Sequence, residues 1–301
     1  MKLRTGVTLL LTVIIFYLLF SRVDFYSVVN VFAGSNLIFI VLALSTLAPV
    51  FWIKSKRWQM LLEAMNHKVS FKDSFYATMM AMPLLAVTPS KMGDLVKAYY
   101  HRKTVPVSES VGAVITEKLF DLMVLLLFCL LWVYFVGQVY LIAVLGVGII
   151  MVLGLIIAYK FDFKIDLLNR LLKSLKVLMK DKINFAKVFL ITLVFWSVLS
   201  LQFIFVFAAL GIEVPYLIIV GGIAVSILVG MIPVTLAGMG TRDSAIIFIF
   251  LNYADPSHLL GVGLLFSFLR YWLPALIGLP YFRKINVDLD ILKKIKDKGK
   301  V

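Results

Sequence analysis

The chain has 301 residues, of which 62% are hydrophobic and 15% charged, and its mean hydropathy is +1.02. These values exclude a soluble globular domain and predict an all-α polytopic membrane protein. The net charge of +14 comes from Lys and Arg blocks beside apolar runs, which favours cytoplasmic loops and anionic lipid over nucleic acid. The single cysteine, Cys129, lies within an apolar run, so it allows no intrachain disulfide and is expected in the core.

The first two apolar runs are interpreted as spans. The run from Gly6 to Phe20 follows basic residues but lacks a small-residue cleavage pattern, so we interpret it as an uncleaved first span rather than a signal peptide. The second run extends from Leu37 to Ile53. Basic and aromatic residues follow it, and such clusters are typical of a cytoplasmic membrane anchor. The expected anchor consists of Lys54, Lys56, Arg57 and Trp58.

The next apolar stretch, Phe75 to Val87, is about 13 residues long, whereas a helix needs about 20 to cross the hydrocarbon core. Pro83 and Pro89 also interrupt backbone hydrogen bonding. We therefore expect a re-entrant hairpin from the cytoplasm, with its turn at Gly93 and Asp94. The alternative is a peripheral helix on the surface. Further basic residues follow on the cytoplasmic side: Lys97, His101, Arg102 and Lys103.

The segment Val114 to Asp121 leads into thirty-eight residues without a charge, which suits two spans broken near Gly137. Glu117 and Asp121 lie one helical turn apart on one face, with Lys118 beside them. They are candidate site residues. The alternative is a helix start at which acids suit the helix dipole.

The second half begins with a basic amphipathic pattern over Phe163 to Lys182, which predicts a helix on the cytoplasmic membrane surface. A span follows from Phe189 to Leu210. The charge-free run from Tyr216 to Thr241 contains several glycines, including Gly238 and Gly240, which weaken a straight helix. Arg242 and Asp243 then open a shorter apolar run, so we expect a second hairpin that enters from outside.

The last span, about Leu259 to Phe282, carries Arg270 near its centre. An arginine at this depth costs about 2.5–3.5 kcal/mol on insertion scales, which suggests a functional role in binding an anion. The structural alternative is an ion pair of Arg270 with Asp243 or Glu117.

The distribution of basic residues predicts six full spans and two re-entrant hairpins, with both termini cytoplasmic and the chain in the cell membrane. A count of eight spans also leaves the termini inside. Asp94 and Asp243 are 149 residues apart, and the spans around them run in opposite directions, which predicts an inverted internal repeat. We expect one membrane domain over 1–301, with halves 1–160 and 161–285 and a basic tail at 286–301.

These motifs together resemble one family, the flippase-like transmembrane region of lysylphosphatidylglycerol synthases and their stand-alone relatives. The similarity covers nearly the whole chain. It rests on Arg57-Trp58, Pro89 through Asp94 with Lys97, Glu117-Lys118 with Asp121, Gly238 through Asp243, and Arg270 before Gly278. The family pattern favours Arg where Lys91, Lys97 and Lys118 stand and Glu where Asp94 and Asp243 stand, so this chain keeps the charge but loses the guanidinium fork. We expect no counterpart of the synthases' aminoacyl-transferase domain in this chain.

The resemblance implies movement of an anionic phospholipid or a polyprenyl-phosphate-linked lipid between leaflets, without a cofactor or chemistry on the lipid. The expected substrate-binding residues are Arg270, Arg242, Asp243, Lys91, Asp94, Lys97, Glu117, Lys118 and Asp121, and the turn glycines are Gly93, Gly238 and Gly240. Cations and polar backbone at depth suit a lipid headgroup. The alternatives are a transporter of a small soluble anion, a lipid-phosphate enzyme and a scaffold. The scattered histidines make a poor metal or acid–base site, so we expect no catalytic residue.

Overall fold

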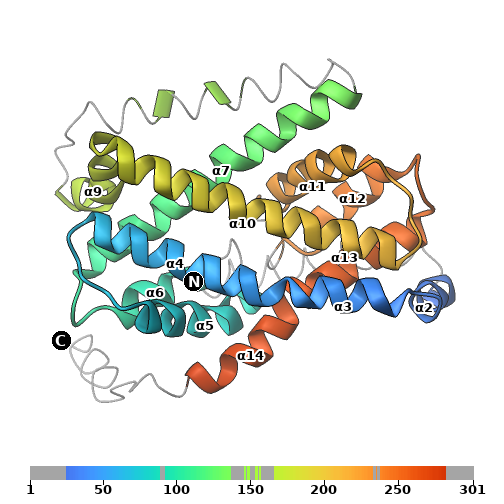
Figure 1. The fold of residues 1–301 in the computed structure, drawn as a ribbon, viewed down its shortest axis with the longest axis horizontal. Coiled ribbons are helices and arrows are strands. Elements are labelled where there is room, and N and C mark those ends of the chain that lie inside the picture. The colour runs from blue at the N-terminus through green and yellow to red at the C-terminus, as the bar shows by residue number, and fades with distance from the viewer. Residues whose placement is uncertain are drawn as a thin grey trace, which may run out of the picture.

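The computed structural model describes residues 25–88, 92–136, 166–232, 235 and 238–282, with six single positions between 146 and 156. Every regular element in these ranges is helical, as predicted (Figure 1). The expected first span, Lys91, the break near Gly137 and the basic tail lie outside the described residues.

Three helical stretches in the described ranges are long and apolar enough to cross a membrane: Leu37–Ala64, Lys182–Ala209 and Pro256–Tyr281. The elements in chain order are α2 (Phe25–Ala33), α3 (Leu37–Ser45), α4 (Leu47–Ala64), α5 (Phe71–Val87), the 3-10 turn η1 (Met92–Asp94), α6 (Leu95–Tyr100), α7 (Val107–Val136), α9 (Asp166–Lys180), α10 (Lys182–Ala209), α11 (Tyr216–Gly230), α12 (Thr241–Phe250), α13 (Pro256–Ser267), the π-helical turn η3 (Phe268–Trp272) and α14 (Leu273–Phe282).

Polar side chains set several helix starts. The Ser70 hydroxyl accepts from the Asp73 amide and starts α5, and the Asp181 carboxylate accepts from the amides of Ile183 and Asn184 and starts α10. The cap at Ser70 makes α5 17 residues long, longer than its uninterrupted apolar run. Helix α7 begins at Val107, well before the predicted segment.

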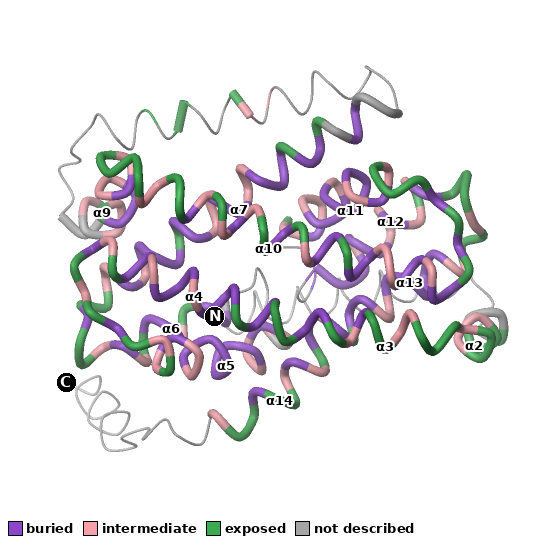
Figure 2. Tube along the Cα trace, viewed as in Figure 1, coloured by how far each residue is buried: buried purple, intermediate pink, exposed green. Residues whose placement is uncertain are grey.

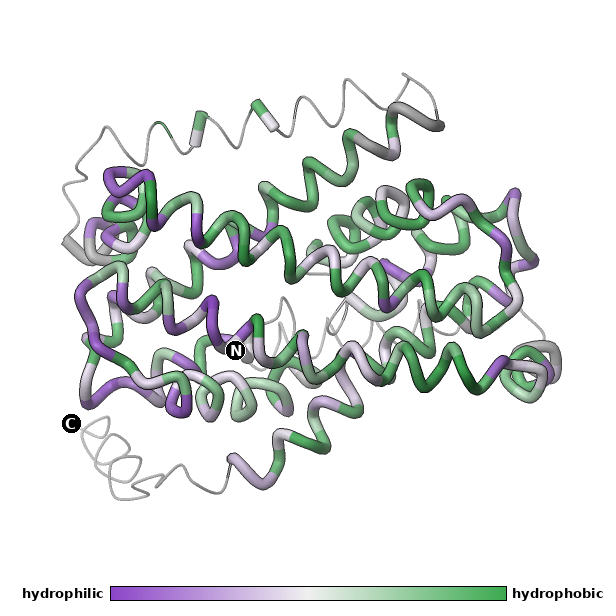
Figure 3. Tube along the Cα trace, viewed as in Figure 1, coloured by the Kyte–Doolittle hydropathy of each residue, from purple (hydrophilic) through white to green (hydrophobic). Residues whose placement is uncertain are grey.

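The helices of the two halves pack against one another. Figure 1 shows α3 and α4 in line, with α10 alongside both. Helix α5 packs against η1, α6 and α14, whereas α7 packs against α11 and α9. Helix α11 in turn packs against α12. Hydrophilic stretches gather at the two ends of the long dimension and hydrophobic helices fill the space between, except that α4 is hydrophilic in its middle (Figure 3).

The core lies where α10 meets its neighbours, and buried positions recur along α4, α5 and α7 (Figure 2). Phe203 of α10 stacks on Phe266 of α13 at 4.0 Å between ring centroids, and Phe207 meets Phe250 of α12 edge-on. Cys129 is 1% exposed, which confirms its expected place in the core.

The predicted amphipathic helix is present as α9, Asp166–Lys180. Its Leu175 and Leu178 are buried, because α9 packs on α7 and α4. At the contact with α7, a Cβ on Gly112 would lie 2.2 Å from the Leu171 carbonyl oxygen, so this crossing requires a glycine. The apolar face of α9 is thus largely covered by protein.

Candidate functional site

Three of the four residues expected to anchor α4 at the membrane surface, Lys54, Arg57 and Trp58, are instead buried in the protein, so the anchor interpretation is wrong for them. Lys54 is 3% exposed, Arg57 1% and Trp58 0%. Lys97 and His101, expected on the cytoplasmic side, are also buried, and burial lowers the pKa of His101 to about 4. The reason is that α4 continues for two turns beyond Arg57 and packs against α5, α7 and α10.

Arg57 joins the two acids of α7. Its Nη2 donates to Glu117 Oε1 at 2.6 Å, and its Nη1 donates to Asp121 Oδ1 at the same distance. Since α7 begins at Val107, these acids stand about three turns inside the helix, and the helix-start explanation for them is wrong. The indole of Trp196 on α10 also donates to Asp121 Oδ1, at 3.0 Å. The one-turn spacing of the two acids therefore matches the two arms of one guanidinium.

Asp94, at the turn between α5 and α6, gathers the lysines. Lys118 Nζ lies 2.5 Å from Asp94 Oδ2, and Lys54 Nζ and Lys97 Nζ lie 3.2 and 3.4 Å from Asp94 Oδ1. Lys97 also donates to Glu117 and sits over the ring of Trp58. The α5–α6 turn is thereby tied to α4 and α7.

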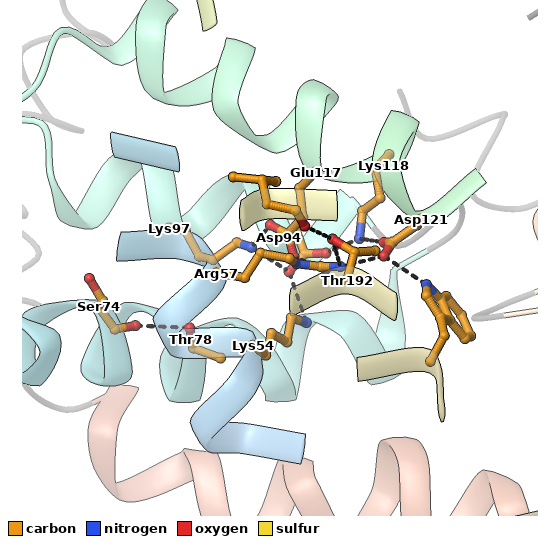
Figure 4. A network of polar contacts seen from close by, with 12 residues as sticks. Lys54, Arg57, Ser74, Thr78, Asp94, Lys97, Glu117, Lys118, Asp121 and Thr192 are labelled. Carbon is orange, nitrogen blue, oxygen red and sulfur yellow. Dashed lines mark hydrogen bonds and ion pairs between the residues drawn. The ribbon is translucent and has the colours of Figure 1, made fainter. Parts of the chain in front are cut away.

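These seven charged residues form one cluster, which we call the ion network (Figure 4). It carries four cations against three carboxylates, and its side chains are buried except that of Lys118, which is 29% exposed. Burying so many charges is unfavourable unless each is paired, and pairing occurs throughout the network. The surplus of one positive charge favours an anion nearby. Its members are Lys54, Arg57, Asp94, Lys97, Glu117, Lys118 and Asp121.

A second buried pair lies at the start of α12. Arg242 Nε and Nη2 donate to Asp243 Oδ1 at 2.9 and 2.5 Å, and Nη2 also donates to Ser267 Oγ at 2.6 Å. The other carboxylate oxygen, Asp243 Oδ2, accepts from the amide of Gly240 at 3.0 Å and caps the helix. Arg242 Nη1 is buried and has no hydrogen-bond acceptor among the described residues.

Arg270 lies in the π-helical turn η3, which interrupts the last long helix. Such turns occur frequently at functional sites. The expected structural pairing is not found, since Asp243 pairs with Arg242 and Glu117 pairs with Arg57 and Lys97. Within the described ranges Arg270 has no ion pair, and its guanidinium carbon lies 5.3 Å from the centre of the Phe195 ring. Its contact with the aromatic face of Phe195 is a cation–π interaction.

Two adjoining cavities meet at Arg270. Measured as the space open to the centre of a water-sized sphere, the larger, here the basic cavity, has about 30 Å³ and the smaller, here the arginine cavity, has about 10 Å³. Trp196, Arg270 and Tyr271 line both. The basic cavity is also lined by Lys54, Asp94, Lys118, Asp121, Met82, Leu85 and Met231. The arginine cavity is also lined by Arg242, Gly230, Ile227 and Phe266.

The structure thus brings the predicted residues Asp94, Lys118, Asp121 and Arg270 around one cavity, with Arg242 around its neighbour. Lys97, Glu117 and Asp243 lie behind them as paired counter-charges, and Lys91 is outside the described residues. Sequence reasoning missed Lys54 and Arg57 as site residues, and Trp196 entirely. A signal existed for two of them. Lys54 and Arg57 fall on the helical face of Val50, Ile53, Leu61 and Leu62, whereas Lys56 falls beside it.

Comparison with known proteins identifies the family of the chain. The family described as "Lysylphosphatidylglycerol synthase TM region" matches residues 6–278. The UPF0104 membrane protein MJ1078 of Methanocaldococcus jannaschii is 30% identical over 70% of this chain and 97% of its own length. From the same organism, the UPF0104 membrane protein MJ1595 is 25% identical over 99% of this chain and 98% of its own length. The chain is therefore a membrane protein that belongs to the lysylphosphatidylglycerol synthase transmembrane-region family.

Proposed function

We propose that the protein moves an anionic lipid, a phospholipid or a polyprenyl-phosphate-linked lipid, between leaflets and binds its phosphate beside Arg270. The observation that carries the proposal is a cation inside an apolar helix, without an ion pair among the described residues, at the junction of two cavities. A phosphate there would gain charge-assisted hydrogen bonds from Arg270. Lys118 and Lys54 line the same cavity and add positive charge.

The contacts between helices support the inverted repeat on which this transport mechanism rests. Helix α5, from the first half, packs on α14 of the second, and α11 of the second half packs on α7 of the first. The two turns are also alike. A Cβ on Gly93 would lie 2.4 Å from the amide of Leu85, and a Cβ on Gly238 would lie 2.3 Å from the carbonyl oxygen of Gly230. Each glycine touches backbone eight residues earlier, as expected for two related hairpins at a shared site.

Alternating access would follow from the ion network. When a phosphate binds Lys118 and Arg270, it competes with Asp94 for Lys118, and the turn that carries Asp94 is then held less firmly to α7. A ligand shifts a conformational equilibrium only by binding the two states differently. The contact of Lys118 with Asp94 is a difference of this kind, because it is available only while the cavity holds no anion.

Arg270→Ala tests the proposal in liposomes that contain labelled phosphatidylglycerol or a labelled polyprenyl phosphate. We expect wild-type protein to accelerate lipid movement and the variant to slow it about tenfold or more, since a hydrogen bond between charged groups contributes about 1.5–3 kcal/mol. The melting temperature should stay the same or rise, because the change removes a cation that has no ion pair in the described ranges.

Arg102→Ala is the matched control, since Arg102 stacks on Tyr99 away from both cavities. If Arg270→Ala moves lipid at the wild-type rate, Arg270 does not bind the phosphate. If wild-type protein moves no lipid but accelerates uptake of sulfate or phosphate, the soluble-anion alternative replaces the lipid proposal.

Topology gives a separate prediction. We expect Lys103→Cys, in the loop after α6, to react with an impermeant maleimide from the cytoplasm, and Tyr253→Cys, in the loop after α12, to react from outside. Both positions are exposed. Cys129 is buried and should remain silent in the folded protein. Labelling of both introduced cysteines from one side would contradict the proposed arrangement of hairpins.

A further inference from the structure

Arg242 carries a feature that binding of a single phosphate leaves unexplained. Its Nε and Nη2 are satisfied by Asp243 and Ser267, whereas its Nη1, also buried, has no acceptor among the described residues. The side chain is 2% exposed and lines the arginine cavity. A buried charged donor without a partner is costly, so native structures seldom keep one without a functional reason.

The two cavities differ in what they offer. The basic cavity has Lys54 and Lys118, with carboxylates of Asp94 and Asp121 that are already paired to other cations. The arginine cavity contains no carboxylate among its lining residues; its polar groups are the guanidinium groups of Arg242 and Arg270, with Trp196 and Tyr271 in its wall. A phosphate in the basic cavity alone would leave Arg242 Nη1 unpaired. An anion in the arginine cavity alone would leave the surplus charge of the ion network unmatched.

We propose that the ligand carries two adjacent phosphoryl groups, one in each cavity, with Arg270 between them. This inference rests on the proposed function and narrows its substrate class to a diphosphate, either lipid-linked or free. Arg270 has several donors in one plane, so it can contact both groups at once. Arg242 Nη1 then binds the group in the arginine cavity, and Lys54 and Lys118 bind the other.

The test is isothermal titration calorimetry on the full chain in detergent, with inorganic phosphate, inorganic pyrophosphate and citrate at one ionic strength. We expect pyrophosphate to bind at least about tenfold more tightly than phosphate, as bidentate contacts to a second group add affinity. Citrate is included because its charge resembles that of pyrophosphate while its shape does not. Equal binding of phosphate and pyrophosphate, or equal binding of citrate and pyrophosphate, would overturn the inference.

Two variants separate the cavities. Arg242→Lys keeps a cation beside Asp243 but loses Nη1, and Ile227→Phe fills the arginine cavity without changing any charge. Both should lower pyrophosphate affinity to within about threefold of the phosphate value. Arg102→Lys serves as the control for an arginine-to-lysine change elsewhere and should bind both anions as wild type does. Unchanged pyrophosphate affinity in Ile227→Phe would count against the two-cavity site.

Transport by the protein in vesicles distinguishes a lipid-linked from a free diphosphate. The vesicles contain labelled polyprenyl monophosphate or diphosphate, or labelled pyrophosphate is added outside. A lipid-linked ligand predicts faster movement of the diphosphate lipid than of the monophosphate lipid, and a free ligand predicts uptake of pyrophosphate. Movement of monophosphate lipid that depends on Arg270, together with equal anion affinities, would sustain the proposed function and reject this inference.

Discussion

Arg57→Met should lower the free energy of unfolding by about 3–5 kcal/mol, because it leaves two buried carboxylates without their shared cation. Arg57 is 1% exposed and bonds Glu117 and Asp121 at 2.6 Å each. Methionine has a similar volume, so the loss reflects charge rather than a cavity. The measurement is chemical denaturation in detergent, followed by tryptophan fluorescence, to which the buried Trp58 and Trp196 contribute.

Lys56→Met is the matched control, since Lys56 lies one residue away on α4, is half-buried and bonds only Gln59 in the described ranges. It should change stability by less than about 1 kcal/mol. If Arg57→Met and Lys56→Met destabilise equally, the ion network does not hold α4 to α7.

Gly238→Ala should lower the free energy of unfolding by about 2–5 kcal/mol and disturb the Arg242–Asp243 pair. Gly238 has a φ of 76°, where alanine costs roughly 1–2 kcal/mol. Its Cβ would also lie 2.3 Å from the Gly230 carbonyl oxygen, and such overpacking costs about 1–3 kcal/mol more.

Gly211→Ala separates the two causes. Gly211 has a similar φ of 69°, but a Cβ there has no heavy atom within 4 Å, so only the backbone term applies. Gly93→Ala is the converse case, in which the Cβ would lie 2.4 Å from the Leu85 amide, with no left-handed φ involved. Thermal unfolding of the three variants should rank Gly238→Ala as least stable and Gly211→Ala as most stable. Equal losses in Gly211→Ala and Gly238→Ala would contradict a tight turn at Gly238.

The helical class, the glycine turn before Arg242 and the place of Arg270 in the last span were predictable from sequence, because composition and hydropathy report them locally. The spacing of Glu117 and Asp121 correctly indicated a shared face. The spacing did not predict that Arg57 is their partner, since Arg57 lies 60 and 64 residues earlier in the chain. Pairing at that distance leaves no periodic signal in the sequence.

The interpretation of α4 failed for a physical reason. A basic cluster after an apolar run has the same composition whether it meets lipid headgroups or buried carboxylates, and the positive-inside rule assumes the former. The two cases differ only in the helix face on which the basic residues lie. Lys54 and Arg57 lie on the same face as the buried Val50 and Leu61. The start of α7 at Val107 was missed because polar residues precede its apolar stretch.

The packing of α5 on α14 has a consequence for biosynthesis. Helix α5 is synthesised early, whereas its partner α14 is the last described helix to leave the ribosome. The two helices pack closely, because a Cβ on Gly278 of α14 would lie 2.4 Å from the Met79 carbonyl oxygen of α5. Helix α5 contains Pro83 and many small or sulfur-bearing residues, so it is a weak candidate for insertion by itself. The contact of α5 with α14 can therefore form only after the chain has been synthesised to the end of α14.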